Sequence, residues 1–192
     1  MKESIIISTL IIIIYIFFKS NKTNLLLIEN NGNNVLVRNT SDSIESAKLL
    51  SEIINRLYLL RNNMIENKHL YPNFIQYINL MENNFNKKRT IIYENNIDSK
   101  FTSYSVNKGE ELVFCLRCKI TKKLHKLNLL MYVAIHEIAH TACPEIGHPP
   151  LFNLIFKFLL GHSITLNLYI YENYNDTPVL YCGMKLYTNI LN

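Results

Sequence analysis

Charged residues and cysteines are both scarce in this chain of 192 residues. Charged residues make up 18% of it and hydrophobic residues 48%, a balance that excludes a disordered protein and suffices for one domain with its own core. The four cysteines include one C-x-x-C, Cys115 and Cys118, and a zinc knuckle would need all four to converge. We therefore expect unpaired thiols. A disulfide would be expected only outside the cytosol, and the sequence leaves its pairing open.

Aromatic residues are lacking where the chain is most basic. Lysine and arginine gather at residues 87–89 and again at residues 119–126, and no aromatic side chain is interleaved there to stack on bases. The net charge of +5 accompanies a joint excess of Asn, Ile, Lys and Tyr, which reflects nucleotide composition rather than selection for a basic face. We interpret both clusters as solvated loops, and nucleic acid is not the favoured partner.

The first segment of the chain is apolar and uncharged over residues 4–18, with lysines on both sides. As a helix it would extend about 22 Å, which snorkelling lysines and local thinning can match to a bilayer. No small-x-small cleavage site follows, so residues 1–22 are predicted to be a retained signal anchor with a transmembrane helix. The basic residues after the run outnumber Lys2 before it. The positive-inside rule therefore predicts a single-pass membrane protein with a cytoplasmic catalytic domain.

Residues 23–192 have the pattern of a folded α+β domain. Two β-rich stretches flank the turn at residues 30–34, which predicts a hairpin. Apolar residues then recur every three or four positions over residues 43–66, as in an amphipathic helix of about six turns. Pro72 interrupts this pattern, and a second, shorter helix is predicted over residues 73–85.

The motif H-E-x-x-H occurs once, as His136, Glu137 and His140, within an apolar pattern of helical spacing. Residues four apart share one face of a helix, so the two imidazoles can bind a single ion with Glu137 beside it. Neutral imidazole suits Zn²⁺, which in a catalytic site takes three protein ligands and leaves a fourth position for water. The motif therefore predicts a zinc site, with Glu137 as the catalytic base.

A third zinc ligand must come from elsewhere in the sequence. His148 is preferred, because Pro144 and Gly147 can end the helix and turn the chain back towards the motif. Glu145 is the alternative, whereas His162 is interpreted as an ordinary helix-terminal histidine.

A further helix is predicted to start at Pro150 and to end at Gly161, with Phe152 packed under His148. Tyr181 is the first candidate to donate a hydrogen bond to the oxyanion of a tetrahedral intermediate, and Tyr171 and Tyr174 are the alternatives.

The run HEIAH followed by GHPPLF resembles the WLM and SprT-like zinc metallopeptidases, which are HExxH zincins with a further His and, four residues later, a Phe. Here these residues are His148 and Phe152. The resemblance covers a catalytic core of about residues 93–185 and is closest to short versions from large DNA viruses. It implies a small zincin-like α+β domain, with an active-site helix and a small mixed sheet. It also implies that the strand predicted over residues 110–117 borders the substrate cleft, so that a peptide adds as an extra strand.

The sequence therefore predicts a membrane-anchored zinc-dependent metallopeptidase that hydrolyses peptide bonds of a protein or peptide substrate through a zinc-activated water. One alternative is a catalytically inactive, zinc-stabilised membrane protein, in which Glu145 or Cys143 closes the site as a fourth ligand. The other, which the resemblance implies, is a DNA-associated protease of the crosslink-repair type.

Overall fold

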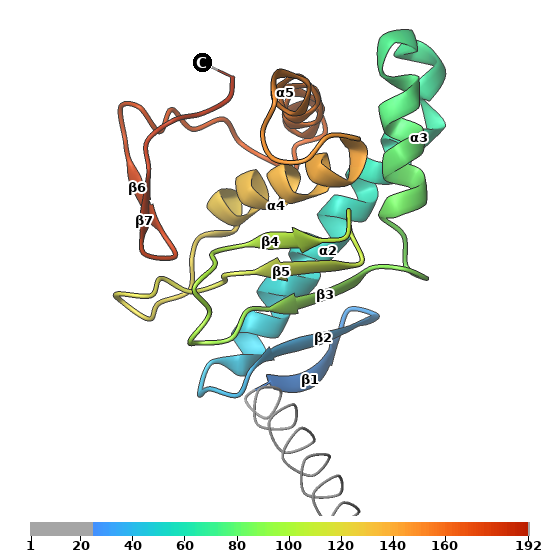
Figure 1. The fold of residues 1–192 in the computed structure, drawn as a ribbon. Coiled ribbons are helices and arrows are strands. Elements are labelled where there is room, and N and C mark those ends of the chain that lie inside the picture. The colour runs from blue at the N-terminus through green and yellow to red at the C-terminus, as the bar shows by residue number, and fades with distance from the viewer. Residues whose placement is uncertain (1–24, 192) are drawn as a thin grey trace, which may run out of the picture.

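The computed structural model describes residues 25–191, and the predicted membrane anchor over residues 1–22 lies outside this range. None of the helices within residues 25–191 has the length and apolar character needed to cross a bilayer. The centre of the fold is a five-stranded mixed sheet in the order β1-β2-β3-β5-β4 (Figure 1). Its strands are β1 (Leu25–Asn30), β2 (Asn33–Arg38), β3 (Ile91–Glu94), β4 (Tyr104–Val106) and β5 (Glu111–Phe114).

The predicted hairpin is confirmed as β1 and β2, which pair antiparallel along their full length. Asn31 and Gly32 both have positive φ at its turn, the conformation that favours Asn-Gly in two-residue hairpins. β2 pairs parallel with β3, and β3 parallel with β5. β4 pairs antiparallel with β5 and closes the sheet on that side.

One prediction about the sheet is wrong. The strand expected to border the cleft, over residues 110–117, forms β5, and β5 lies between β3 and β4 inside the sheet. The edge is β4, which precedes β5 across the turn at Asn107, Lys108 and Gly109. A three-residue strand is too short to show an alternating pattern, so β4 left no signal of its own in the sequence.

Helix α2 (Ser43–Glu66) has the predicted bounds and packs against both the sheet and the motif helix. Its buried residues recur every three or four positions from Ser46 to Met64, which is the periodicity that predicted it. The second predicted helix is a 3-10 turn, η2 (Pro72–Phe74), continued by α3 (Ile75–Asn84). A further 3-10 turn, η1 (Lys68–Leu70), separates α2 from η2.

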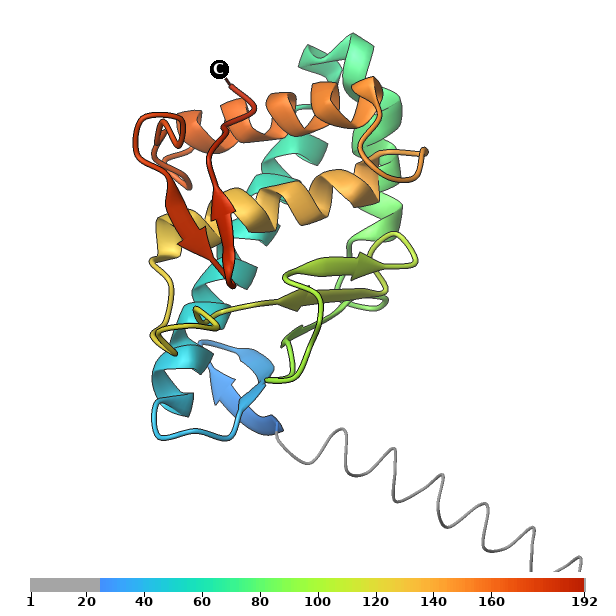
Figure 2. The same ribbon diagram turned by 60° about the vertical axis from the view of Figure 1, so that its left-hand side comes forward.

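The motif lies on α4 (Leu127–Ala142), which packs against α2, α3 and α5 (Pro150–Thr165). Figure 2 shows α4 between α5 and the sheet edge formed by β4. The prediction that α5 ends at Gly161 is wrong. Asn167, with φ 55°, supplies the left-handed residue that ends the helix, and Leu168 N–H donates to Ser163 O at 2.8 Å.

The tail folds back as a hairpin of β6 (Val179–Tyr181) and β7 (Met184–Leu186), which a Cys115–Cys182 disulfide ties to the residue after β5. The expectation of unpaired thiols is therefore wrong for these two cysteines, because the returning tail brings together residues 67 apart in sequence. It is confirmed for Cys118 and Cys143, which are free and buried.

A buried ionic cluster fixes the ends of three strands. Glu94, at the end of β3, is fully buried and accepts from Arg117 Nε at 3.0 Å and from the backbone N–H of Arg38 at 2.8 Å. Arg117 also donates to Asp42 and Ser46 at the start of α2. The cluster thus joins β2, β3, the extension of β5 and α2.

Candidate metal centre

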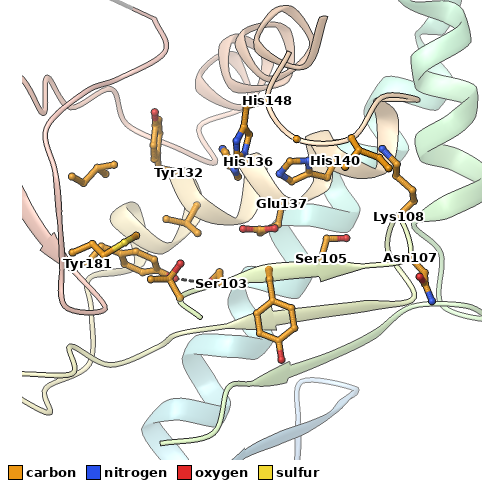
Figure 3. Close-up of a pocket in the computed structure, with 17 residues that line it drawn as sticks. Ser103, Ser105, Asn107, Lys108, Tyr132, His136, Glu137, His140, His148 and Tyr181 are labelled. Carbon is orange, nitrogen blue, oxygen red and sulfur yellow. Dashed lines mark hydrogen bonds between the residues drawn. The ribbon is translucent and has the colours of Figure 1, made fainter. Parts of the chain in front are cut away.

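Three histidines converge above the sheet edge (Figure 3). His136 and His140 project from successive turns of α4, and His148 returns from the loop before α5. Their ligand nitrogens all lie within 4.8 Å of one another, and Nε2 of His148 is 3.0 Å from Nε2 of His136. Zn–N bonds of about 2.0–2.1 Å in a tetrahedron place ligand nitrogens about 3.3 Å apart, so this donor set fits zinc.

The two helical histidines are held in the neutral form that binds metal. Burial, together with the neighbouring His140 and His148, lowers the pKa of His136 to about 3. Burial lowers the pKa of His140 to about 4, again with a contribution from His148. At neutral pH a metal ion therefore need not displace a proton from either ring.

The loop between the second and third histidines follows the predicted course. α4 ends at Ala142, and Gly147 turns the chain with φ 79°. Among the described residues, the side chains of Glu145 and His162 lie outside the histidine cluster. His162 lies in the last turn of α5, where its Nδ1 is 2.9 Å from Phe158 O.

Phe152 forms the apolar wall behind the three imidazoles. Its ring stacks on His140 with centroids 4.3 Å apart and meets His136 and His148 edge-on at 4.9 and 4.8 Å. The side chain is almost fully buried. Phe152 therefore packs under His148, as predicted, and contacts both helical histidines as well.

Glu137 lies on the side of α4 that faces β4, below the imidazoles in Figure 3. The residue is only 5% exposed, and this burial raises the pKa of its carboxyl to about 8. A cation held by the histidines would favour the ionised carboxylate. With a cation bound, the pKa of Glu137 would therefore lie below its metal-free value.

Tyr181 lines the same cleft from the β6–β7 hairpin, and its hydroxyl is 2.5 Å from Ser103 Oγ. Burial raises the pKa of Tyr181, and the nearby Glu137 raises it further, so the phenol keeps its proton at neutral pH. Tyr171 and Tyr174 are not among the residues that line this cleft. Ser103 was not identified from the sequence, because nothing in its local pattern distinguishes it.

A cleft of about 750 Å³ runs along the sheet edge. One wall is the stretch 102–108, which contains β4, and the other is α4 with the histidines. A second hollow of about 640 Å³ adjoins it beneath α5 and the C-terminal residues 186–190, and His136 and His148 line both. The histidine cluster therefore lies where the two hollows meet.

The fold of this chain is similar to that of a protein of known structure, Wss1. No family model matches the chain. The crystal structure of Wss1 from Saccharomyces cerevisiae aligns with a TM-score of 0.51 at 20% identity, over 69% of this chain and 88% of that one. A Wss1 mutant structure aligns equally well, over 90% of its chain. The chain is thus an α+β protein with a Wss1-like fold and a three-histidine cluster that fits a metal ion.

Two viral proteins are similar in sequence. Protein R325 of Acanthamoeba polyphaga mimivirus is 40% identical over 156 residues, which is 81% of this chain and 78% of R325. Protein 136R of Invertebrate iridescent virus 6 is 29% identical over 88% of this chain and 92% of its own. The chain belongs to the family of viral proteins that includes R325.

Proposed function

We propose that the chain is a zinc-dependent metallopeptidase that hydrolyses peptide bonds in extended polypeptide segments. The observation that carries the proposal is the convergence of three histidine nitrogens within 4.8 Å, beside a buried glutamate in a cleft. When bound there, zinc would polarise the scissile carbonyl and supply an acidified water. The three histidines would hold it, and Phe152 behind them would keep their rings oriented.

Glu137 is the proposed general base. It accepts a proton from the attacking water and donates a proton to the leaving amine as the peptide bond breaks. Its burial between α4 and β4 leaves only 5% of the residue exposed. A cation held by the histidines would lower the pKa of Glu137 from about 8 and so favour the ionised carboxylate, the form that accepts a proton.

Tyr181 is the proposed oxyanion donor. Its protonated phenol lines the cleft beside Ser103 and on the β4 side of the histidines (Figure 3). A donor fixed in a desolvated wall stabilises the charge that develops on the carbonyl oxygen in the transition state. Replacement of Tyr181 by Phe should therefore lower kcat while leaving zinc bound.

The substrate is proposed to add to β4. Within the described sheet, β4 is the last strand on the cleft side, so a peptide can pair with its main chain. Ile146, which is 92% exposed, and Met184 line the cleft and offer apolar contact to substrate side chains. The second hollow beyond His136 and His148 would receive the residues on the other side of the scissile bond.

The inactive alternative requires a closed site with a fourth protein ligand. Within residues 25–191 the cluster comprises three histidines, and Cys143 is a free, buried thiol outside it. An open fourth position supports catalysis over a purely structural role. Anchoring through residues 1–22 and the cytoplasmic orientation stay predictions. The Cys115–Cys182 disulfide favours the opposite side of the membrane, and protease protection of membrane fractions would distinguish the two orientations.

The decisive experiment compares Glu137→Gln with the unchanged chain. The variant should bind zinc as tightly and lose at least about 100-fold in kcat on an unfolded protein substrate, since the base is removed and the ligands remain. Glu145→Gln is the matched control, because Glu145 is an exposed carboxyl of the loop that carries His148. It should keep both zinc and activity. Retained proteolysis in Glu137→Gln would refute the mechanism.

A further inference from the structure

The turn between β4 and β5 is fixed against the end of α4. Asn107, Lys108 and Gly109 all have positive φ, at 46°, 57° and 106°. A Cβ at Gly109 would come within 2.9 Å of both Asn84 O and Thr141 Cγ2, so the turn rests directly on α3 and α4. Glycine is needed there for space as well as for conformation.

Arg89 also holds this turn. Its Nη2 donates to Asn107 O at 2.7 Å, and its Nη1 donates to Lys108 O at 3.1 Å and to Asn84 O at 2.8 Å. Asn84 in turn donates from Nδ2 to Thr141 O at 2.9 Å. The backbone that carries Lys108 is therefore anchored to the last turn of α4.

From this fixed base, the side chain of Lys108 reaches the segment that leads to the third histidine (Figure 3). Its ammonium donates to Cys143 O at 2.7 Å and to Glu145 O. Both carbonyls follow the end of α4, where backbone acceptors lack helical partners and a cation is favourable. The same lysine also lines the cleft beside His140.

We infer that Lys108 is a positioning residue for the third metal ligand, because it fastens the loop of residues 143–147 so that His148 meets the two helical histidines. The inference rests on the proposed function of this site. α4 fixes His136 and His140 relative to each other, whereas His148 follows an exposed loop that turns at Gly147. Lys108 joins that loop to the strand on which the substrate is proposed to bind.

The direction in which zinc affinity changes when Lys108 is replaced distinguishes a positioning role from a purely electrostatic one. A lysine beside a cation site repels the cation, so loss of its charge alone would strengthen zinc binding. Loss of a group that orients a ligand weakens binding, typically by about 10–100-fold. Positioning and charge therefore predict opposite changes for the same substitution.

The test measures zinc affinity of the full chain by competition with a chromophoric chelator, and the visible absorption of the Co²⁺-loaded form. Lys108→Met should bind zinc about 10–100-fold more weakly and give a Co²⁺ spectrum like that of His148→Ala. Lys108→Arg should keep most of the zinc affinity of the unchanged chain. Lys108→Gln, which has a neutral donor, should have a zinc affinity between those of Lys108→Arg and Lys108→Met. Lys157→Met, the same change at an exposed lysine of α5, is the matched control and should bind as the unchanged chain does.

A double-mutant cycle identifies the route of the effect. If Lys108 acts through His148, then Lys108→Met should cause no further loss in a His148→Ala background. The inference would be overturned if Lys108→Met bound zinc as tightly as the unchanged chain or more tightly. It would also be overturned if Lys108→Met lowered zinc affinity equally in both backgrounds. Neither result would affect the finding that the unchanged chain binds zinc. Absence of zinc binding in the unchanged chain would instead defeat the proposed function, and the inference with it.

Discussion

Reduction of the Cys115–Cys182 disulfide should destabilise the chain by about 4 kcal/mol. The two cysteines are 67 residues apart. Releasing a loop of that length returns roughly 15 cal/mol/K of entropy to the unfolded chain, or about 4.4 kcal/mol at 25 °C. In a domain of this size each kcal/mol shifts Tm by about 2–4 °C, so Tm should fall by roughly 9–18 °C.

The functional effect of reduction should be selective. The disulfide secures the hairpin that carries Tyr181 and Met184 into the cleft, whereas the histidines lie on α4 and the loop before α5. Zinc affinity should therefore stay unchanged while kcat/KM for a peptide falls.

Thermal unfolding, chelator competition and peptide cleavage, each with and without a phosphine reductant, would test this prediction. Titratable thiols should rise from two to four on reduction. Cys118→Ser, which removes a free thiol, should respond to the reductant as the unchanged chain does. A Tm shift below about 3 °C, or a parallel loss of zinc, would refute the reasoning.

Three further predictions follow from the site and its surroundings. His148→Ala should bind zinc much more weakly, through the two remaining histidines, and Glu145→Ala should bind it as the unchanged chain does, as chelator competition would show; the reverse result would make Glu145 the third ligand. Phe152→Leu should cost about 2 kcal/mol in urea unfolding and weaken zinc binding about tenfold, because ring contacts to three ligands are lost. His125 Nε2 accepts from the backbone N–H of Cys182, and burial lowers the pKa of His125 from its ordinary 6.5. His125 therefore binds a proton more readily in the unfolded chain than in the folded chain. Its contribution to the free energy of unfolding is fully present above about pH 6.5 and is lost as the pH falls below that value. His125→Asn should reduce that loss between pH 7.5 and 5.5 in urea titrations, and an unaltered pH slope would contradict the assignment.

The parts of the fold that the sequence predicted correctly rest on local signals. The apolar residues of α2 repeat without interruption, so the bounds 43–66 follow from them directly. Asn31 and Gly32 specify the first hairpin through their left-handed conformations. The H-E-x-x-H spacing places His136 and His140 on one helical face whatever surrounds them.

The errors concern features decided by tertiary packing. Gly161 costs about 1 kcal/mol within a helix, yet α5 continues past it to Thr165, with Leu160 and Ser163 buried on either side of the glycine. Glu94 accepts hydrogen bonds from Arg38 and Arg117, which lie 56 and 23 residues away in sequence, and no local pattern links these residues. The disulfide and the short edge strand β4 depend in the same way on segments that meet only in the folded chain.

If a substrate adds to β4 as proposed, the position of this strand at the sheet edge also determines what the substrate must offer. An edge strand recognises main-chain amides and carbonyls, which every polypeptide has and which a folded protein keeps paired. Tyr104–Val106 can therefore engage only a stretch that has come loose from its own structure. Such an enzyme would distinguish polypeptides by their conformational state. A resistant protein would become cleavable when a segment is unfolded, with no recognition sequence added to it.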